Sequence, residues 1–303
     1  MSARNDLPAP GALDRRAQGL ALSPAVIMLA VFFVLPLMLV PVASLMEANP
    51  WGGVRPNFST AAYVQILLEE DFSGNWHFQD AYLRILLRSV AIAAVTAFLC
   101  LLVGFPVAYV IAMQPKSRQG FLLLLVTVPF WTNLLVRTYC WIMILRDEGL
   151  INHGLEAVGL IDAPLRLLYT NGAIAIGLLY TFLPFMVLPI YNSVERIDRS
   201  LIEAAHDLYA GRLATLRRVV LPLARPGIIS GVVLVFVPAL GSFVAPALLG
   251  GGKHLMIGSL IQMQFGNARN WPFGAAMSLV LLLLAFGFLL WLYRRRRQGS
   301  VGL

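Results

Sequence analysis

Six long apolar stretches constrain this chain more than any other feature of its sequence. A helix needs about 20 apolar residues to cross the hydrocarbon core of a bilayer. The stretches that meet this length cover residues 24–46, 86–113, 121–145, 173–194, 227–249 and 275–293. Only 13% of the 303 residues are charged, whereas a soluble domain has about 25%. The sequence therefore predicts an all-α integral membrane protein with about six transmembrane helices.

The Lys and Arg residues are concentrated in those connections that share one side of the membrane with the N-terminus. Such a bias marks the cytoplasmic side, so both termini are expected in the cytoplasm. This orientation divides the chain into a tail of residues 1–23, a transmembrane domain of residues 24–293 and a basic tail of residues 294–303. The net charge of +8 follows from the same bias, and no nucleic-acid partner is expected.

Few side chains could support catalysis or drive a carrier that works alone. The four histidines lie in separate connections without the spacing of metal ligands, so no metal site is expected. The segment Gly250-Gly251-Gly252-Lys253 lacks the spacing of a phosphate-binding loop, so this chain is not expected to hydrolyse ATP or to be an enzyme. The middle of the apolar stretches contains no Asp or Glu, although ion-driven carriers usually need such groups at depth. A stand-alone secondary carrier or channel for a small solute is the alternative to a subunit of a larger transporter.

Arg137 lies inside the third apolar stretch. An arginine at the centre of a transmembrane helix costs about 2.5–3.5 kcal/mol on insertion scales. Two interpretations stay open at this point. Either Arg137 faces protein or water, with Asn133 one turn away on the same helical face, or its side chain extends to the outer interface.

Two outer connections are long, and each contains a segment that could form a short helix. Residues 47–85 contain a possible short helix from Thr60 to Glu70, and residues 250–274 contain an amphipathic stretch from Leu255 to Phe265. These loops either contact an external partner or are solvated connections.

The polar segment 195–226 lies between the fourth and fifth apolar stretches, on the expected cytoplasmic side. Ile197, Leu201, Ala204 and Leu208 recur near helical spacing between charged residues of both signs, and the pattern repeats before Pro222. Two short amphipathic helices are therefore predicted. Mixed charge favours docking to another protein over a helix that lies on the lipid surface.

Several stretches resemble one family of membrane proteins. Glu203-Ala204-Ala205 followed by Val219-x-Leu221-Pro222 resembles the EAA loop of bacterial ABC importer permeases. Other matching stretches are Pro129-Phe130-Trp131-Thr132, Val136-Arg137-Thr138-Tyr139, Leu183-Pro184-Phe185-Met186-Val187-Leu188-Pro189, Val237-Pro238-Ala239-Leu240-Gly241, Leu248 to Lys253 and Asn270 to Ala276. Together they are similar to the spermidine/putrescine permeases from the first apolar stretch to about Ala276.

The resemblance implies a type I importer permease of the bacterial inner membrane that forms half of a translocation path for a polyamine or a related small amine. The implied partners are a second permease subunit, two cytoplasmic ATPase subunits and a periplasmic substrate-binding protein. No cofactor is implied in this chain, because the partner ATPase uses ATP and magnesium.

The resemblance also implies two sets of functional residues. The EAA loop docks on the ATPase and couples ATP hydrolysis to transport through Leu201, Glu203, Ala204, Ala205, Asp207, Leu208, Tyr209, Gly211, Arg217 and Arg218. The translocation path is assigned to Trp131, Arg137, Tyr139, Tyr180, Phe185, Ser242 and Phe243. Aromatic faces in such a path can hold alkyl-ammonium groups.

Two positions depart from the family pattern. Tyr209 stands where the family usually has a glycine that permits a turn between helices, so either Gly211 makes the turn or the first helix runs longer. Ser242 stands where the family tends to have an acidic residue, which would suit a cationic substrate.

Overall fold

The computed structural model of the chain describes residues 15–70 and 75–299. Within these ranges five helices are long and apolar enough to cross a membrane, and a bent pair adds a sixth crossing if it counts as one span. The five are Leu22–Ser44, Ala81–Met113, Asn171–Glu195, Arg212–Gly241 and Trp271–Leu292. The prediction of about six transmembrane helices is confirmed. Of the two predicted tails, residues 1–14 and 300–303 lie outside the described residues.

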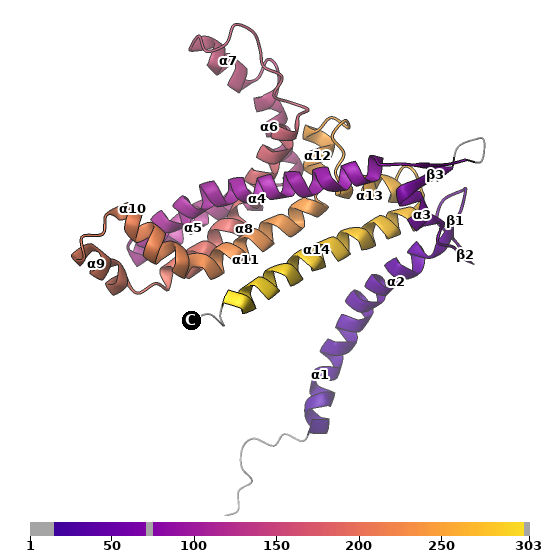
Figure 1. The fold of residues 1–303 in the computed structure, drawn as a ribbon, viewed down its shortest axis with the longest axis horizontal. Helices are drawn as coiled ribbons and strands as arrows, with labels where there is room; N and C mark the ends of the chain where they lie inside the picture. Colours follow the sequence, from indigo (N-terminus) through magenta and orange to yellow (C-terminus); the bar gives the residue numbers. More distant parts are fainter. Residues whose placement is uncertain (1–14, 71–74, 300–303) are drawn as a thin grey trace, which may run out of the picture.

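Three long helices, α4 (Ala81–Met113), α8 (Asn171–Glu195) and α11 (Leu221–Gly241), pack together at the centre of the bundle (Figure 1). Small side chains allow close approach of helices in a membrane, where van der Waals packing replaces the hydrophobic effect. The face of α4 toward α8 and α11 accordingly has the buried residues Ala93, Ala97, Cys100 and Ala108.

Gly227 marks a very close approach of α11 to α8. A Cβ atom at this position would lie 2.4 Å from the carbonyl oxygen of Pro189 and 2.5 Å from Oγ of Ser193. Only glycine leaves room for this contact between the two helices.

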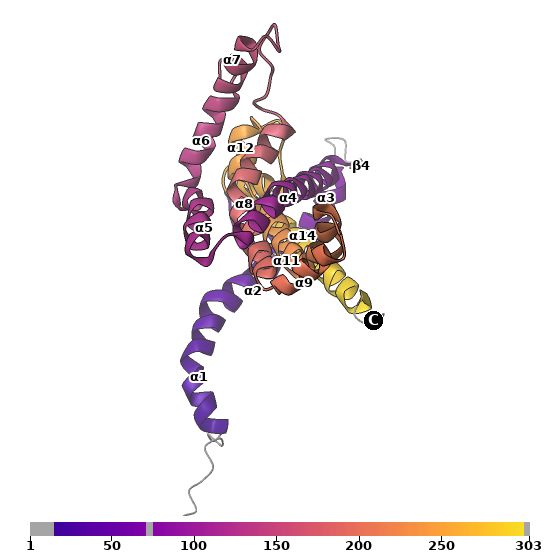
Figure 2. The same ribbon diagram turned by 90° about the vertical axis from the view of Figure 1, so that its left-hand side faces the viewer.

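The first span is separate from this centre. It consists of α1 (Arg15–Leu29), a π-helical turn η1 (Ala30–Val34) and α2 (Leu35–Ser44). Both views show α1 extending away from the bundle (Figure 1 and Figure 2). Within the described residues, the main packing of this span on the rest of the chain is that of α2 against the last helix α14 (Trp271–Gly299). Phe32 is 75% exposed, and no residue in the most apolar part of the span is buried.

The third apolar stretch is not the single helix over residues 121–145 that the sequence predicts. It is divided into α5 (Lys116–Trp131) and α6 (Leu134–Leu145), and the α6 side is bent from α5 by 89°. The side chains at the break explain why it occurs. Thr132 Oγ1 donates to the carbonyl of Pro129 at 2.7 Å, and Asn133 Oδ1 accepts from the Leu135 N–H at 2.8 Å. Asn133 is thus the N-cap of a new helix.

The fifth span also differs from its predicted range of 227–249. The helix begins in the polar segment, as α10 (Arg212–Thr215), continues through the π-helical turn η2 (Leu216–Val220) into α11, and ends at Gly241. Pro222 does not stop it, because the π turn lies directly before the residue that lacks an N–H donor. Residues 244–249 form a separate short helix, α12 (Val244–Leu249).

The outer connections contain two small hairpins, which the prediction of an all-α fold did not include. Strand β1 (Met46–Ala48) pairs antiparallel with β2 (Val54–Phe58), and β3 (Leu68–Glu70) pairs antiparallel with β4 (Trp76–Phe78). The predicted helix at residues 60–70 is therefore shorter, α3 (Ala61–Leu67).

Two more short helices complete the outer side. The amphipathic stretch after Leu255 forms α13 (Ile257–Phe265), and α7 (Leu150–Ala157) follows α6.

Candidate functional site

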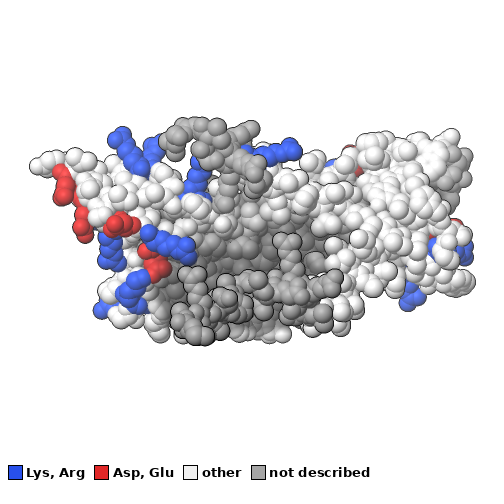
Figure 3. All heavy atoms as spheres, turned by 90° about the horizontal axis from the view of Figure 1, so that it is seen from below, with Lys and Arg blue, Asp and Glu red and all other residues white. Residues whose placement is uncertain are grey.

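The polar segment between α8 and α11 forms a protruding end of the molecule. Its first helix, α9 (Arg199–Asp207), begins at Asp198, whose Oδ1 accepts a hydrogen bond of 3.0 Å from the Ser200 N–H. The hydrogen bonds from Ser200 lower the pKa of the Asp198 carboxyl, so the cap stays ionised at neutral pH. Figure 1 shows α9 and α10 at the same end of the bundle as the C-terminus. Figure 3 shows basic and acidic side chains gathered toward this end.

Nine of the ten residues assigned to ATPase coupling are exposed, and Ala205 is the buried exception. α9 packs on the turn η2, so Ala205 anchors the helix to its own chain. Around it, Leu201, Leu208 and Tyr209 are exposed to solvent by 48%, 82% and 99%. Leu213, which the sequence analysis did not assign, is 77% exposed and extends this apolar surface. An exposed apolar surface of this kind marks an interaction site.

The end of α9 explains why glycine is usual at position 209. The N–H of Ala210 bonds to the carbonyl of Ala205, and the N–H of Tyr209 bonds to the carbonyl of His206, both at 2.9 Å. This pair of bonds is a Schellman motif, in which the residue after the C-cap has a left-handed conformation. Tyr209 takes that conformation itself, with φ of 58°. A side chain with a Cβ pays roughly 1–2 kcal/mol for it.

Both alternatives offered for this turn are therefore wrong. α9 does not run longer, since it ends at Asp207, and Gly211 does not make the turn. Gly211 is the N-cap of α10, with an extended φ of −65°. The family departure at Tyr209 is a real strain in the backbone of this chain.

The second half of the segment is continuous with a membrane helix. Arg217 and Arg218 lie exposed on η2, and the same helix continues into α11 without a loop. The prediction of two separate short helices is correct for α9 and wrong for residues 212–220. At the base of the segment, Lys116 forms an ion pair with Glu195, which ties the start of α5 to the end of α8. A displacement of the segment would thus reach the bundle directly.

The residues assigned to the translocation path do not all come together. Phe185 stacks edge-on with Phe130 at 5.1 Å between ring centroids, and Tyr180 stacks edge-on with Trp141 at 5.8 Å. Both are partly buried where α8 meets α5 and α6. Trp131 and Tyr139 instead point outward and are 82% and 56% exposed.

Arg137 lies on the packed face of α6. It is 8% exposed, and neither Nε nor Nη1 has a hydrogen-bond partner within the described part of the chain. The structure thus favours the interpretation that Arg137 faces protein, and it does not support an extended side chain at the interface. An unpaired buried charge is costly.

Ser242 and Phe243 form the break between α11 and α12. Ser242 has an extended conformation with ψ of 136°, and Phe243 is 46% exposed. The start of α13 lies against this break, since a Cβ atom on Gly258 would be 2.4 Å from the carbonyl oxygen of Gly241. The position where the family tends to have an acid is thus a helix break next to a second helix.

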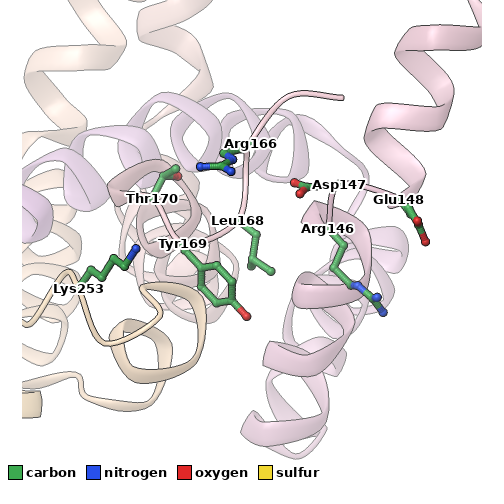
Figure 4. Close-up of a pocket in the computed structure, with 8 residues that line it drawn as sticks. All are labelled: Arg146, Asp147, Glu148, Arg166, Leu168, Tyr169, Thr170 and Lys253. Atoms are coloured by element: carbon green, nitrogen blue, oxygen red, sulfur yellow. The ribbon is translucent and has the colours of Figure 1, made fainter. Parts of the chain in front are cut away.

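A polar hollow of about 570 Å³ lies at the start of α8, and the sequence analysis did not foresee it. Since α8 has 25 residues, the hollow is about 37 Å from the polar segment at its other end. Figure 4 shows Arg166, Thr170 and Lys253 on one side and Arg146, Asp147 and Glu148 on the other. The structure records no ion pair among these side chains in the described part of the chain.

Asn152 fixes the wall of this hollow. Its side chain is 1% exposed and donates from Nδ2 to the carbonyls of Arg146, Asp147 and Leu165 at 3.0–3.2 Å. Its Oδ1 accepts from the Leu165 N–H at 3.0 Å. In the sequence these charged residues indicated only the orientation of the chain in the membrane. The hollow itself could not be recognised there, because it is formed by chain segments more than 80 residues apart.

Comparison with known proteins gives a consistent result. Residues 101–298 match the family described as "Binding-protein-dependent transport system inner membrane component". The spermidine/putrescine transport system permease protein PotB of Escherichia coli (strain K12) is 39% identical over 267 residues, which cover 88% of this chain and 93% of the relative. PotB of Haemophilus influenzae is 42% identical over 222 residues, 73% of this chain and 77% of the relative.

The fold has solved counterparts. A chain from a bacterial ABC transporter involved in the import of the acidic polysaccharide alginate superposes with a TM-score of 0.67. The superposition covers 94% of this chain and 96% of the other at 16% identity, so it shows a common fold.

Proposed function

Because the chain belongs to the family of binding-protein-dependent transport system inner membrane components and is the permease subunit of an ABC importer, we propose that it forms half of a translocation path for putrescine, spermidine or a related small amine. ATP hydrolysis belongs to a separate subunit, and the permease itself carries no cofactor. The transmembrane domain of residues 24–293 contains the path, and residues 195–226 form the coupling segment.

The proposed substrate class rests on one observation. Over 88% of its length the chain is 39% identical to a permease named for spermidine and putrescine. The aromatic residues of the proposed path suit this class, since ring faces attract alkyl-ammonium groups. Ser242 offers no carboxylate in place of the family's acid. Selection of the substrate therefore rests mainly on a periplasmic binding protein.

A second permease subunit is the proposed partner within the membrane, most simply a homologue that completes a heterodimer. The first span supports this proposal, because it packs on its own chain only near α2. The break in the third span leaves further apolar side chains outward, including Trp131, Val136 and Tyr139. Lipid can cover such side chains, but a path built by two halves requires the second half.

The cytoplasmic partner is a pair of ATPase subunits that dock on the coupling segment. Glu203, Ala204 and the exposed apolar residues of α9 form the contact, with Arg217 and Arg218 at its edge. Since the segment continues into α11, closure of the ATPase dimer moves a spanning helix. Coupling of this kind needs an element with two arrangements that both partners bias.

The periplasmic partner is the substrate-binding protein, and the hollow at the start of α8 is its proposed contact on this chain. Arg146, Arg166 and Lys253 have no ion pair there among the described residues, so their charges can meet acidic side chains of a partner. Asn152 holds the wall in place, so little ordering is required on binding.

The test is transport by the full complex in proteoliposomes. The permease, its neighbouring permease and ATPase, and the binding protein should together take up labelled putrescine or spermidine only when ATP is enclosed with the ATPase. Double reversal of Arg217→Glu and Arg218→Glu should abolish ATPase binding. Uptake that continued without ATP or without the ATPase would refute the proposal. ATP-driven uptake of a different solute would refute the substrate class alone.

A further inference from the structure

Tyr209 combines two unfavourable features that its own chain does not explain. Its backbone has a left-handed conformation that glycine would adopt without strain, and its ring is 99% exposed to solvent. A ring with that exposure touches almost nothing within the chain. A glycine or asparagine would satisfy the Schellman turn equally well. The presence of a large aromatic residue at this position therefore calls for a contact outside the chain.

The surroundings of Tyr209 have the composition of an interface centre. Leu208 and Leu213 flank it and are 82% and 77% exposed. Exposed charged residues stand next to them along the chain: Asp207 before Leu208, Arg212 between Tyr209 and Leu213, and Arg217 after Leu213. Apolar and aromatic side chains inside a charged border are typical of the small group of residues that dominates binding energy.

We infer that Tyr209 is the anchor that makes this permease selective for its own ATPase. The inference rests on the proposed coupling role of the segment and adds one specific contact to it. The ring enters an apolar socket on the ATPase, and Leu208 and Leu213 cover the edges of that socket. Tyrosine suits this role because it buries a large, rigid surface with few rotatable bonds.

A selective contact follows from the size of the ring. An ATPase that serves a permease with glycine at this position needs no socket, and the ring of Tyr209 would collide with its surface. The matched ATPase gains the contact, and a mismatched one meets a steric obstacle. Specificity commonly combines such a new attraction with a repulsion. The strain at position 209 is compatible with this role, because strained residues persist at binding sites where another interaction compensates.

The experiment measures the affinity of the ATPase for the full-length permease in its complex with the second permease, held in nanodiscs. Tyr209→Ala removes the ring and keeps the left-handed turn, and it should weaken binding roughly 10–100-fold. Tyr209→Gly should weaken binding equally while it raises the unfolding temperature of the permease, since it removes the strain. Tyr209→Phe keeps the ring and should lose much less affinity than Tyr209→Ala. Trp51→Ala removes an aromatic residue that is 87% exposed on the outer side and serves as the matched control.

The outcomes separate this inference from the proposed function. If Arg217→Glu with Arg218→Glu abolishes binding while Tyr209→Ala binds like the unmodified permease, the anchor is wrong and the coupling surface stands. If neither change affects binding, the coupling surface itself is wrong. A Tyr209→Phe variant as weak as Tyr209→Ala would also overturn the anchor, because the ring would then not be the group that is bound. Selectivity is tested with the ATPase of a permease that has glycine here, which should bind Tyr209→Gly more tightly than the unmodified chain.

Discussion

Replacing Gly227 with alanine tests the close packing of α11 on α8. The added Cβ would lie 2.4 Å from the carbonyl oxygen of Pro189, 2.5 Å from Oγ of Ser193 and 2.7 Å from Cβ of Ser193. Ordinary van der Waals contact begins at 3.4 Å, so a relief of close to an ångström is required. The Ser193 side chain can rotate away, but the Pro189 oxygen belongs to the backbone of α8, so the two helices must separate.

The expected magnitude is the difference of two effects. Overpacking a tight core costs about 1–3 kcal/mol, and a clash with backbone lies at the upper end. Alanine in a helix interior is favoured over glycine by about 1 kcal/mol. Gly227→Ala should therefore destabilise the permease by about 2 kcal/mol. Gly120→Ala in α5 is the matched control, because a Cβ there would meet nothing within 4 Å. It should be neutral or slightly stabilising.

The assay can use a cysteine of the chain itself. Cys100 is fully buried in α4 between α8 and α11, whereas Cys140 is exposed. In a Cys140→Ala background, a thiol-reactive dye added to the detergent-solubilised permease reports the unfolding of the central helices through Cys100. The Gly227→Ala variant should react at a lower temperature than Gly120→Ala. Equal or higher stability of Gly227→Ala would show that α8 and α11 do not approach as described, and ATP-driven uptake should fall with the stability if they do.

Three further outcomes follow from single side chains. Arg137→Met should raise the stability of the isolated permease by about 1–3 kcal/mol, because it removes a buried guanidinium with two nitrogens that lack partners in the described part of the chain. The same change should lower uptake. A loss of stability in the dye assay would mean that Arg137 is paired. Asn152→Ala should lower the stability of the permease by roughly 1–3 kcal/mol, since the carbonyls of Arg146, Asp147 and Leu165 lose their donor. Hydrogen exchange near residues 146–165 should become faster, while that of α9 should not change. The lowered pKa of Asp198 stabilises α9 at every pH above the ordinary range of a carboxyl, and this contribution is lost as pH falls through the lowered value. The protection of residues 199–207, measured as the exchange rate relative to the intrinsic rate at the same pH, should therefore be unchanged at pH 5 and fall only in stronger acid. An Asp198→Asn variant should lose this pH dependence.

The long helices could be predicted because apolar length is a property of a single segment. Bilayer thickness fixes the number of residues, so α4 and α8 were located within a few residues at most ends. The same argument failed at residues 132–133, where the stretch stays largely apolar but Thr132 and Asn133 form local hydrogen bonds that end one helix and begin another. A capping signal at Asn133 was present in the sequence, but it was outweighed by the hydropathy.

The site was foreseen unevenly for a similar reason. The proposed coupling segment is contiguous, so its motif and its amphipathic pattern could be recognised together, and Tyr209 was singled out as a departure from the family pattern. Its φ angle could not be foreseen, because a turn at Gly211 or a longer first helix would each have spared Tyr209 the left-handed conformation. The hollow at Arg166 and Lys253 depends on segments distant in sequence, and no local pattern encodes that proximity.

The uninterrupted helix from Arg212 to Gly241 acts as a balanced lever. Gly227, the glycine of this helix that approaches α8 most closely, stands 15 residues after one end and 14 before the other, so the two arms are about 21–23 Å long. A rod held at its middle swings both tips by equal amounts in opposite directions. A push near Arg217, about 15 Å from Gly227, would therefore reappear reversed and about 1.5 times larger at the Ser242 break, about 22 Å from Gly227 on the far side of the membrane.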